Sequence, residues 1–142
     1  MRSVTVPIIL VNLQDDGFHL LVEIVVFGEK LLAVLDTGAS RSVFDESFIK
    51  KHIDELDCTI ETQATTLFST ASTFQVLIPE IRLGRLLLTD YNAIALNLEA
   101  VNQAYQDLGL APVIGIIGSD LLLKYHGVIN YKRMKLYLSS HP

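Results

Sequence analysis

The chain has 142 residues, enough for one hydrophobic core and too short for two, so we expect a single domain over residues 1–142. Apolar residues make up 50% of the sequence and charged residues 19%, a balance that excludes intrinsic disorder. The net charge of −5 has the wrong sign for a protein that binds nucleic acid by neutralising phosphates. So few charges leave apolar surface to be covered, and a second copy of the chain is the expected partner.

The cysteine and histidine residues argue against a fold held together by a disulfide or by a structural zinc ion. Cys58 has no second cysteine with which to form an intrachain disulfide, and the four histidines do not join it at zinc-site spacing. No stretch reaches the roughly 20 uninterrupted apolar residues that a membrane helix requires. The N-terminal apolar run resembles a strand rather than a signal peptide, so we expect a cytoplasmic protein that does not bind membranes.

Strand patterns dominate the first part of the chain. The apolar segments Val4–Leu13 and Phe18–Phe27 are typical of strands. A tight turn at Gly28-Glu29 leads to Lys30–Leu35, a short apolar strand of the kind that is buried on both faces. This strand runs directly into polar residues 36–40, so the sequence predicts a polar loop at the end of a buried strand.

The middle of the chain combines one helix with extended segments. Asp45 is suited to cap a helix over Glu46–Leu56, whose apolar residues fall on one face. Residues Thr59–Thr73 are rich in Thr and Ser with alternating apolar residues, which predicts an exposed hairpin. Four short strands are predicted around a turn at Gly84-Arg85: Phe74–Ile78, Glu80–Leu83, Leu86–Thr89 and Tyr91–Leu96.

The last part of the chain adds two helices and a hairpin. Asn97 is suited to begin a second helix that Gly109 closes, and Val113–Ile117 is a second buried strand that ends at Gly118. The remaining predicted elements are a short helix over Asp120–Tyr125 and a hairpin of Val128–Tyr131 with Met134–Leu138. Many strands with two to three short helices predict a mainly β fold, a largely antiparallel closed barrel.

Two sequence motifs, each at the end of an apolar strand, indicate a catalytic site. One apolar strand runs into Leu35-Asp36-Thr37-Gly38-Ala39-Ser40, and a later one runs into Ile116-Ile117-Gly118-Ser119-Asp120-Leu121-Leu122. This pair, in this order and with a hairpin at the end, resembles the retropepsin-like aspartic proteases, the single-lobe relatives of pepsin. It is particularly similar to bacterial members with the Gly-Ser-Asp-Leu-Leu helix. The resemblance covers about Val22–Leu138 and implies a single-lobe acid-protease barrel.

The resemblance implies a role for residues of both motifs. Asp36 is the expected catalytic residue; Thr37 would position it by bonding across a dimer axis, and Gly38 through its backbone N–H. The substrate cleft would be bordered by Ala39, Ser40 and Arg41, and by Leu67, Phe68 and Ser69 in the predicted hairpin. Gly118 and Asp120 are expected to support the site, since a carboxylate in the first turn of a helix favours a capping or dipole role.

Peptide hydrolysis by carboxylates requires two of them, and each chain supplies one Asp36. Two carboxylates about 3 Å apart share one proton, so that one activates the water and the other protonates the substrate carbonyl oxygen. A two-fold homodimer would supply the second carboxylate as Asp36 of the other subunit. The sequence therefore predicts a homodimeric aspartic endopeptidase that cleaves peptide or protein substrates without a metal or an organic cofactor.

Two alternatives remain open. Asp36 could be an ordinary residue of an exposed turn, although such a turn has no reason to follow five consecutive apolar residues. The fold could also be a non-catalytic peptide-binding or dimerisation module, because Thr59–Thr73 lacks the glycine-rich tip common in flaps of the family. Asp36-Thr37-Gly38 weighs against the module, because binding alone does not require a buried carboxylate pair with its desolvation cost.

Overall fold

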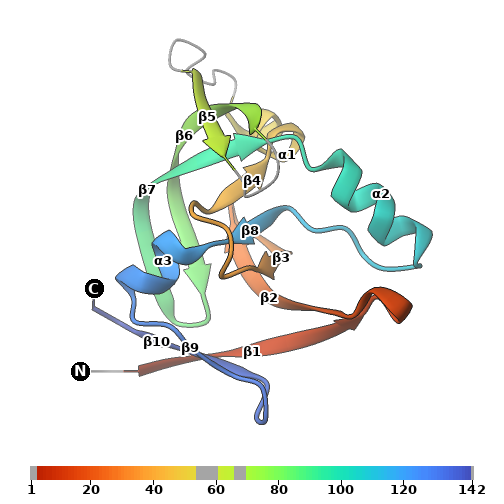
Figure 1. Cartoon of the computed structure of the whole chain (residues 1–142). Helices are drawn as coiled ribbons and strands as arrows, with labels where there is room; N and C mark the ends of the chain where they lie inside the picture. The colour runs from red at the N-terminus through yellow and green to blue at the C-terminus, as the bar shows by residue number, and fades with distance from the viewer. Residues whose placement is uncertain (1–2, 54–60, 66–69, 142) are drawn as a thin grey trace.

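Strands dominate the structure, a computed structural model that describes residues 3–53, 61–65 and 70–141. The described residues form the strands β1 (Ser3–Asn12), β2 (Phe18–Val26), β3 (Glu29–Leu35), β4 (Val43–Asp45), β5 (Glu61–Thr65), β6 (Thr70–Leu83), β7 (Leu86–Leu96), β8 (Gly115–Ile117), β9 (Val128–Asn130) and β10 (Lys135–Ser139). The helices among them are α1 (Glu46–His52), α2 (Glu99–Asp107), α3 (Ser119–Lys124) and a 3-10 turn at Gln14–Asp16. Figure 1 shows their arrangement.

Six strands close into a barrel. They follow the order β6-β7-β4-β8-β3-β2, and pairing of β2 with β6 at Val25 and Val26 closes the ring. Most neighbouring strands are antiparallel, whereas β3 with β8 and β4 with β7 are parallel. The predicted mainly β closed barrel with two to three short helices is therefore confirmed (Figure 1).

The sheet continues beyond the barrel at both ends. At one end, β1 pairs with β2 and then with β10, which carries β9 as the outer strand. At the other end, β5 pairs with β6, and this confirms an extended hairpin within the predicted segment Thr59–Thr73. The expected cleft residues Leu67, Phe68 and Ser69 lie outside the described residues.

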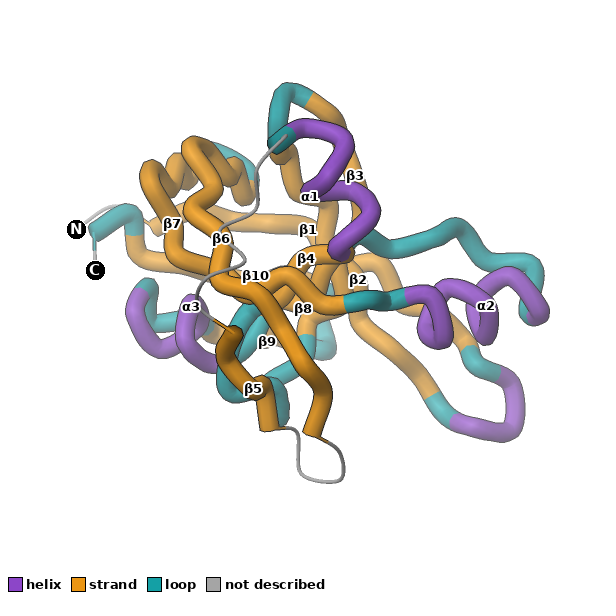
Figure 2. The backbone as a smooth tube through the Cα atoms, turned by 90° about the horizontal axis from the view of Figure 1, so that it is seen from above, coloured by secondary structure: helices purple, strands orange, loops and turns teal. Residues whose placement is uncertain are grey.

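Two hydrophobic clusters fill the fold on opposite faces of β2. Successive side chains of a strand point to opposite faces. Val22 and Ile24 therefore join the cluster inside the barrel, whereas Leu21 joins a second cluster with Val34 and Tyr105 of α2. Helix α2 thus covers the outer face of β2 and β3, on the opposite side of the barrel from α3 (Figure 2).

The first helix is shorter than predicted. The predicted cap Asp45 is confirmed, because its carboxylate accepts a backbone N–H of the first turn. The predicted range Glu46–Leu56 is wrong at its end, since α1 ends at His52 and Ile53 is extended. The His52 ring stacks on Phe27 with centroids 4.6 Å apart, so the contact with the β2–β3 turn holds the end of the helix.

Two predictions about strands are also corrected. Pro79 and Asp90 do not divide their segments, because β6 and β7 pair in a single register on both sides of these residues. The turn after β2 lies one residue earlier than predicted, at Phe27 and Gly28, both with positive φ. A two-residue turn with positive φ at both positions matches the twist of the strands that it joins.

The second helix ends where the sequence places it but begins one residue later than predicted, because Leu98 and not Asn97 is its N-cap. The Asn97 side chain accepts the Glu99 N–H at 2.8 Å, and Gly109 follows the helix with φ of +73°. The left-handed conformation at Gly109 is one that glycine adopts without steric cost. None of the helices in residues 3–53, 61–65 and 70–141 combines the length and the hydrophobicity of a membrane-spanning helix.

Candidate active site

The first motif forms a loop at the end of β3. The Asp36 N–H donates to the Ile117 carbonyl of β8 at 3.0 Å, and the Ala39 N–H donates to the Asp36 carbonyl at 3.2 Å. The Gly38 N–H donates to Oδ1 of Asp36 at 2.9 Å, so the loop orients its own carboxylate. The Asp36 side chain is therefore held in place and is still exposed to solvent.

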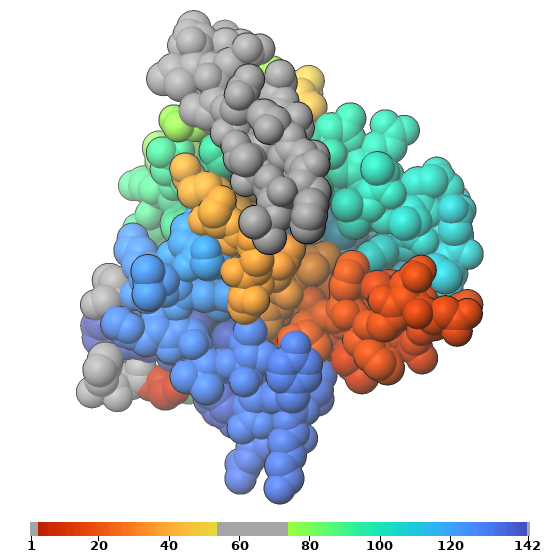
Figure 3. Space-filling model, viewed as in Figure 1, coloured from red at the N-terminus to blue at the C-terminus, as the bar shows by residue number. Residues whose placement is uncertain are grey.

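The loop lies on the surface of the molecule. Thr37, Gly38 and Ser40 are exposed together with Asp36, whereas Ala39 is half-buried. On the face shown in Figure 3, the orange segment that contains this loop lies between the red N-terminal part and the blue C-terminal part. The loop is thus available for contact with a second molecule.

The second motif packs directly against this loop. The Gly118 N–H donates to Oγ of Ser42 at 2.9 Å, and the Ser119 N–H donates to the Ala39 carbonyl at 2.8 Å. A side chain at Gly118 would place its Cβ only 2.6 Å from the Ala39 carbonyl oxygen and 2.9 Å from that of Arg41. Gly118 therefore allows the two motifs to touch through their backbones.

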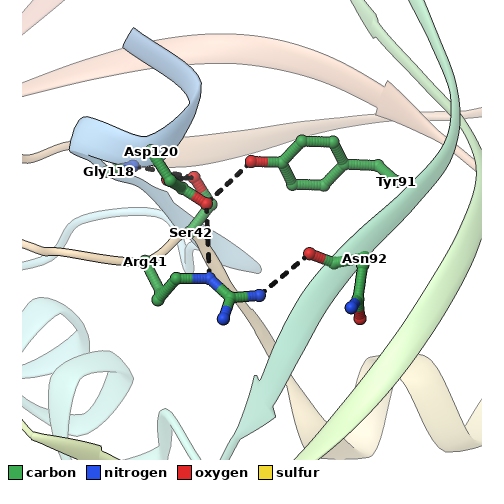
Figure 4. Close-up of polar contacts among 6 residues, drawn as sticks. All are labelled: Arg41, Ser42, Tyr91, Asn92, Gly118 and Asp120. Atoms are coloured by element: carbon green, nitrogen blue, oxygen red, sulfur yellow. Dashed lines mark hydrogen bonds and ion pairs between the residues drawn. The ribbon is translucent and has the colours of Figure 1, made fainter. Parts of the chain in front are cut away.

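Asp120 lies in the first turn of α3 and joins distant parts of the chain (Figure 4). Its Oδ1 accepts the Ser42 hydroxyl at 2.8 Å, and its Oδ2 accepts the Tyr91 hydroxyl at 2.7 Å. The Arg41 guanidinium lies 3.7 Å from Oδ2 and also donates to the Asn92 carbonyl at 3.1 Å. These contacts connect the loop after β3 with β7 and α3.

The electrostatics of this network favour a protonated Tyr91 phenol and an ionised Asp120 carboxylate. Burial raises the pKa of Tyr91, and the hydrogen bond to Asp120 raises it further, so the phenol remains a donor. Burial also acts to raise the pKa of Asp120, but hydrogen bonds from Ser42, Tyr91 and the Leu121 backbone outweigh burial and lower it. Asp120 is therefore an ionised acceptor whose lone pairs are already used.

A cleft of about 400 Å³ opens beside the first motif and includes Asp36 and Thr37. Its remaining lining is apolar or aromatic apart from His19: Phe18, Leu20, Val34, Leu35, Val101, Ile116, Ile129 and Tyr131. The expected cleft residues Ala39, Ser40 and Arg41 do not line this hollow. A larger hollow of about 510 Å³ near Asp45 and Glu99 contains neither motif.

Comparisons with known proteins agree with this architecture. A family model described as aspartyl protease matches residues 22–121, a segment that contains the first motif and all of the second except Leu122. The chain belongs to the aspartyl protease family. No curated protein matches the chain.

Solved structures place this aspartyl protease family member among retropepsin-like folds. A retropepsin-like aspartic protease from Rickettsia conorii matches with 17% identity and a TM-score of 0.55, over 97% of this chain and 94% of that chain. The retroviral protease-like domain of Ddi1 from Leishmania major matches with 14% identity and a TM-score of 0.56, over 80% of this chain and 82% of that chain. The predicted retropepsin-like fold is thus confirmed.

Two residues of the hydrogen-bond network around Asp120 were not predicted from the sequence. Ser42 is fully buried and both donates and accepts, and its only local signal is a small hydroxyl residue directly before apolar Val43-Phe44. Tyr91 carries no local signal, because its partner Asp120 lies 29 residues away along the chain. Both residues emerge only from the pairing of strands.

Proposed function

We propose that this chain is an aspartic endopeptidase whose catalytic pair consists of Asp36 from each of two subunits. The observation that carries the proposal is the exposed Asp36 carboxylate, held by the Gly38 N–H at 2.9 Å beside a mostly apolar cleft. The other carboxylate of the two motifs, Asp120, already accepts from Ser42 and Tyr91. A second catalytic carboxylate is therefore best supplied by another copy of the chain.

Apolar surface around the loop supports a homodimer. Phe18 and Tyr131 are 61% and 68% exposed and line the same cleft as Asp36. Exposed aromatic side chains favour burial against a partner. A two-fold axis through the loops would place the two Asp36 residues face to face, with Thr37 bonding across the axis to brace them.

The reaction proceeds through a water molecule held between the two carboxylates. One Asp36 is ionised and takes a proton from the water as its oxygen attacks the peptide carbonyl carbon. The other Asp36 is protonated and donates to the carbonyl oxygen, which develops negative charge. The C–N bond then breaks as the first Asp36 gives the proton that it took from the water to the amine nitrogen. The second Asp36 takes a proton back from a hydroxyl of the intermediate as the new carboxyl group forms, so the pair again shares one proton.

The test is cleavage of a broad peptide library by the full chain between about pH 4 and 7, because a dyad that shares one proton works between its two macroscopic pKa values. We expect Asp36→Asn to lower the cleavage rate by at least about 10³-fold without changing the folded dimer. Full activity in Asp36→Asn would exclude the proposal. Peptide binding without any cleavage by the wild type would favour the alternative, a non-catalytic binding or dimerisation module.

Mixed dimers separate a shared site from a site within one chain. When wild type and Asp36→Asn are refolded together in equal amounts, random pairing makes only about one quarter of the dimers fully wild type. A shared dyad then predicts about one quarter of the activity of the same total amount of wild type. A value near one half would show that each chain works alone.

A further inference from the structure

The side chains with polar groups that line the cleft are those of Asp36, Thr37, Tyr131 and His19, and the rest of the lining is apolar. His19 follows Phe18 at the start of β2, and it lines the cleft together with Val101 of α2 and Ile116 of β8. An apolar pocket with a small number of placed polar groups is the usual form of a selective binding site. Asp36 and Thr37 belong to the loop of the first motif and Tyr131 is 68% exposed, so half-buried His19 is the residue placed to distinguish between substrate side chains of similar size.

The orientation of His19 is set by α2. Its Nδ1 lies 2.7 Å from Oη of Tyr105, and the two ring centroids are 5.9 Å apart. Tyr105 is only 2% exposed and packs in a cluster with Leu21 and Val34. Because Tyr105 cannot turn without disturbing this cluster, it fixes the direction of the imidazole ring.

The same hydrogen bond sets the position of the proton on His19. Burial raises the pKa of Tyr105, so its hydroxyl keeps its hydrogen, and a buried hydroxyl needs an acceptor for it. Nδ1 of His19 lies 2.7 Å from this hydroxyl, and we assign it as the acceptor. Neutral His19 therefore carries its hydrogen on Nε2, on the edge of the ring away from Tyr105.

We propose that His19 is a specificity-determining residue that selects a tyrosine over a phenylalanine side chain of the substrate in this cleft. The tyrosine ring would contact Val34, Val101 and Ile116, and its oxygen would accept the N–H of His19 Nε2. Glutamate also ends in an acceptor but is disfavoured by the nearby Asp36 and by the net charge of −5. This inference rests on the proposed function, because it places the selected residue close to the cleaved bond.

The first test uses pairs of peptides that differ only by tyrosine or phenylalanine at one position flanking the cleavage site. We expect the wild type to prefer tyrosine in kcat/KM by roughly 3- to 10-fold at one position, the effect of one neutral hydrogen bond. His19→Phe keeps a ring but lacks the donor, so its ratio should fall to about one. No tyrosine preference in the wild type, or an equal preference in His19→Phe, would overturn the inference.

Two variants separate hydrogen bonding from packing. Val101→Ala removes apolar contact only, so it should lower kcat/KM for both peptides of a pair and keep their ratio. Tyr105→Phe keeps the core volume but releases Nδ1 of His19, so it should reduce the tyrosine preference. If Val101→Ala changes the tyrosine-to-phenylalanine ratio of kcat/KM as much as His19→Phe does, the cleft selects substrates by shape alone.

A binding measurement distinguishes failure of this inference from failure of the proposed function. N-acetyltyrosinamide and N-acetylphenylalaninamide are added to Asp36→Asn, and the imidazole signals of His19 are followed by NMR. We expect only the tyrosine compound to shift the His19 Nε2 signals. If the wild type cleaves no peptide, the proposed function fails, while equal shifts from both compounds, or none, reject the role of His19.

Discussion

The two motifs place one carboxylate each at neighbouring strand ends, but the surroundings of the two differ. Asp36 is exposed, and its side chain accepts an N–H from its own loop. The Asp120 side chain is 18% exposed and accepts hydroxyl groups of Ser42 and Tyr91, which come from other parts of the chain. The same chemical group can therefore support a fold where its acceptors are filled, or remain open to water and a partner where they are not.

The largest effect on stability is expected where the two regions touch. Gly118→Ala would place a methyl group 2.6 Å from the Ala39 carbonyl oxygen, against backbone that cannot move aside. We expect a loss of about 3 kcal/mol or more in the free energy of unfolding, measured by urea denaturation. The matched change Gly38→Ala meets only the Asp36 side chain at 3.2 Å and should cost less than about 1 kcal/mol. Equal losses would contradict the difference between the two regions.

Removal of each carboxylate tests the comparison directly. Asp120→Ala leaves the buried Ser42 hydroxyl and the Tyr91 hydroxyl without their acceptor, so the free energy of unfolding should fall by about 2–3 kcal/mol. Asp36→Ala removes an exposed side chain and should change it by less than about 1 kcal/mol. Urea denaturation of both variants at neutral pH measures the contrast. A greater loss for Asp36→Ala would show that the supporting residue has been misassigned.

Acid should weaken the supporting region through Asp120. The pKa of this carboxyl is lower in the folded chain than its usual 3.8, so near that pH the unfolded chain binds more protons. The stability due to Asp120 is therefore complete above about pH 5 and is lost as the pH falls through about 4 and below. Asp120→Asn should show a shallower loss between these values in urea titrations. Parallel curves for the two proteins would contradict the lowered pKa.

The smallest changes in the free energy of unfolding are expected when the side chains that contact Asp120 are substituted. Tyr91→Phe removes one hydrogen bond donor and should cost about 1 kcal/mol, because Ser42 still bonds to the carboxylate. Arg41 is 41% exposed and lies 3.7 Å from the carboxylate, so Arg41→Ala should cost less than about 1 kcal/mol. Thermal denaturation of the two variants ranks them. If Arg41→Ala is the more destabilising, the ion pair rather than the phenol braces the site.

Strand content and the position of the motifs were predictable because their signals are local. Five apolar residues directly before Asp36 predict a buried strand, and the structure has β3 end at Leu35. The Asp45 cap and the Gly109 terminator were found for the same reason, since capping residues act within one helical turn. The end of α1 and the unbroken strand through Pro79 were missed, because contacts from distant elements decide them.

The sequence by itself determined that a polar Asp36 loop follows a buried strand and that a second apolar strand ends at Gly118. Only the tertiary structure decided which side chains meet there. Ser42 and Asp120 are 78 positions apart, and they touch because β4 and β8 are neighbours in the closed barrel. His19 and Tyr105 meet across 86 positions because α2 covers β2. Hydrophobic pattern and turn preference act over a few residues, whereas such contacts depend on the closure of the whole sheet.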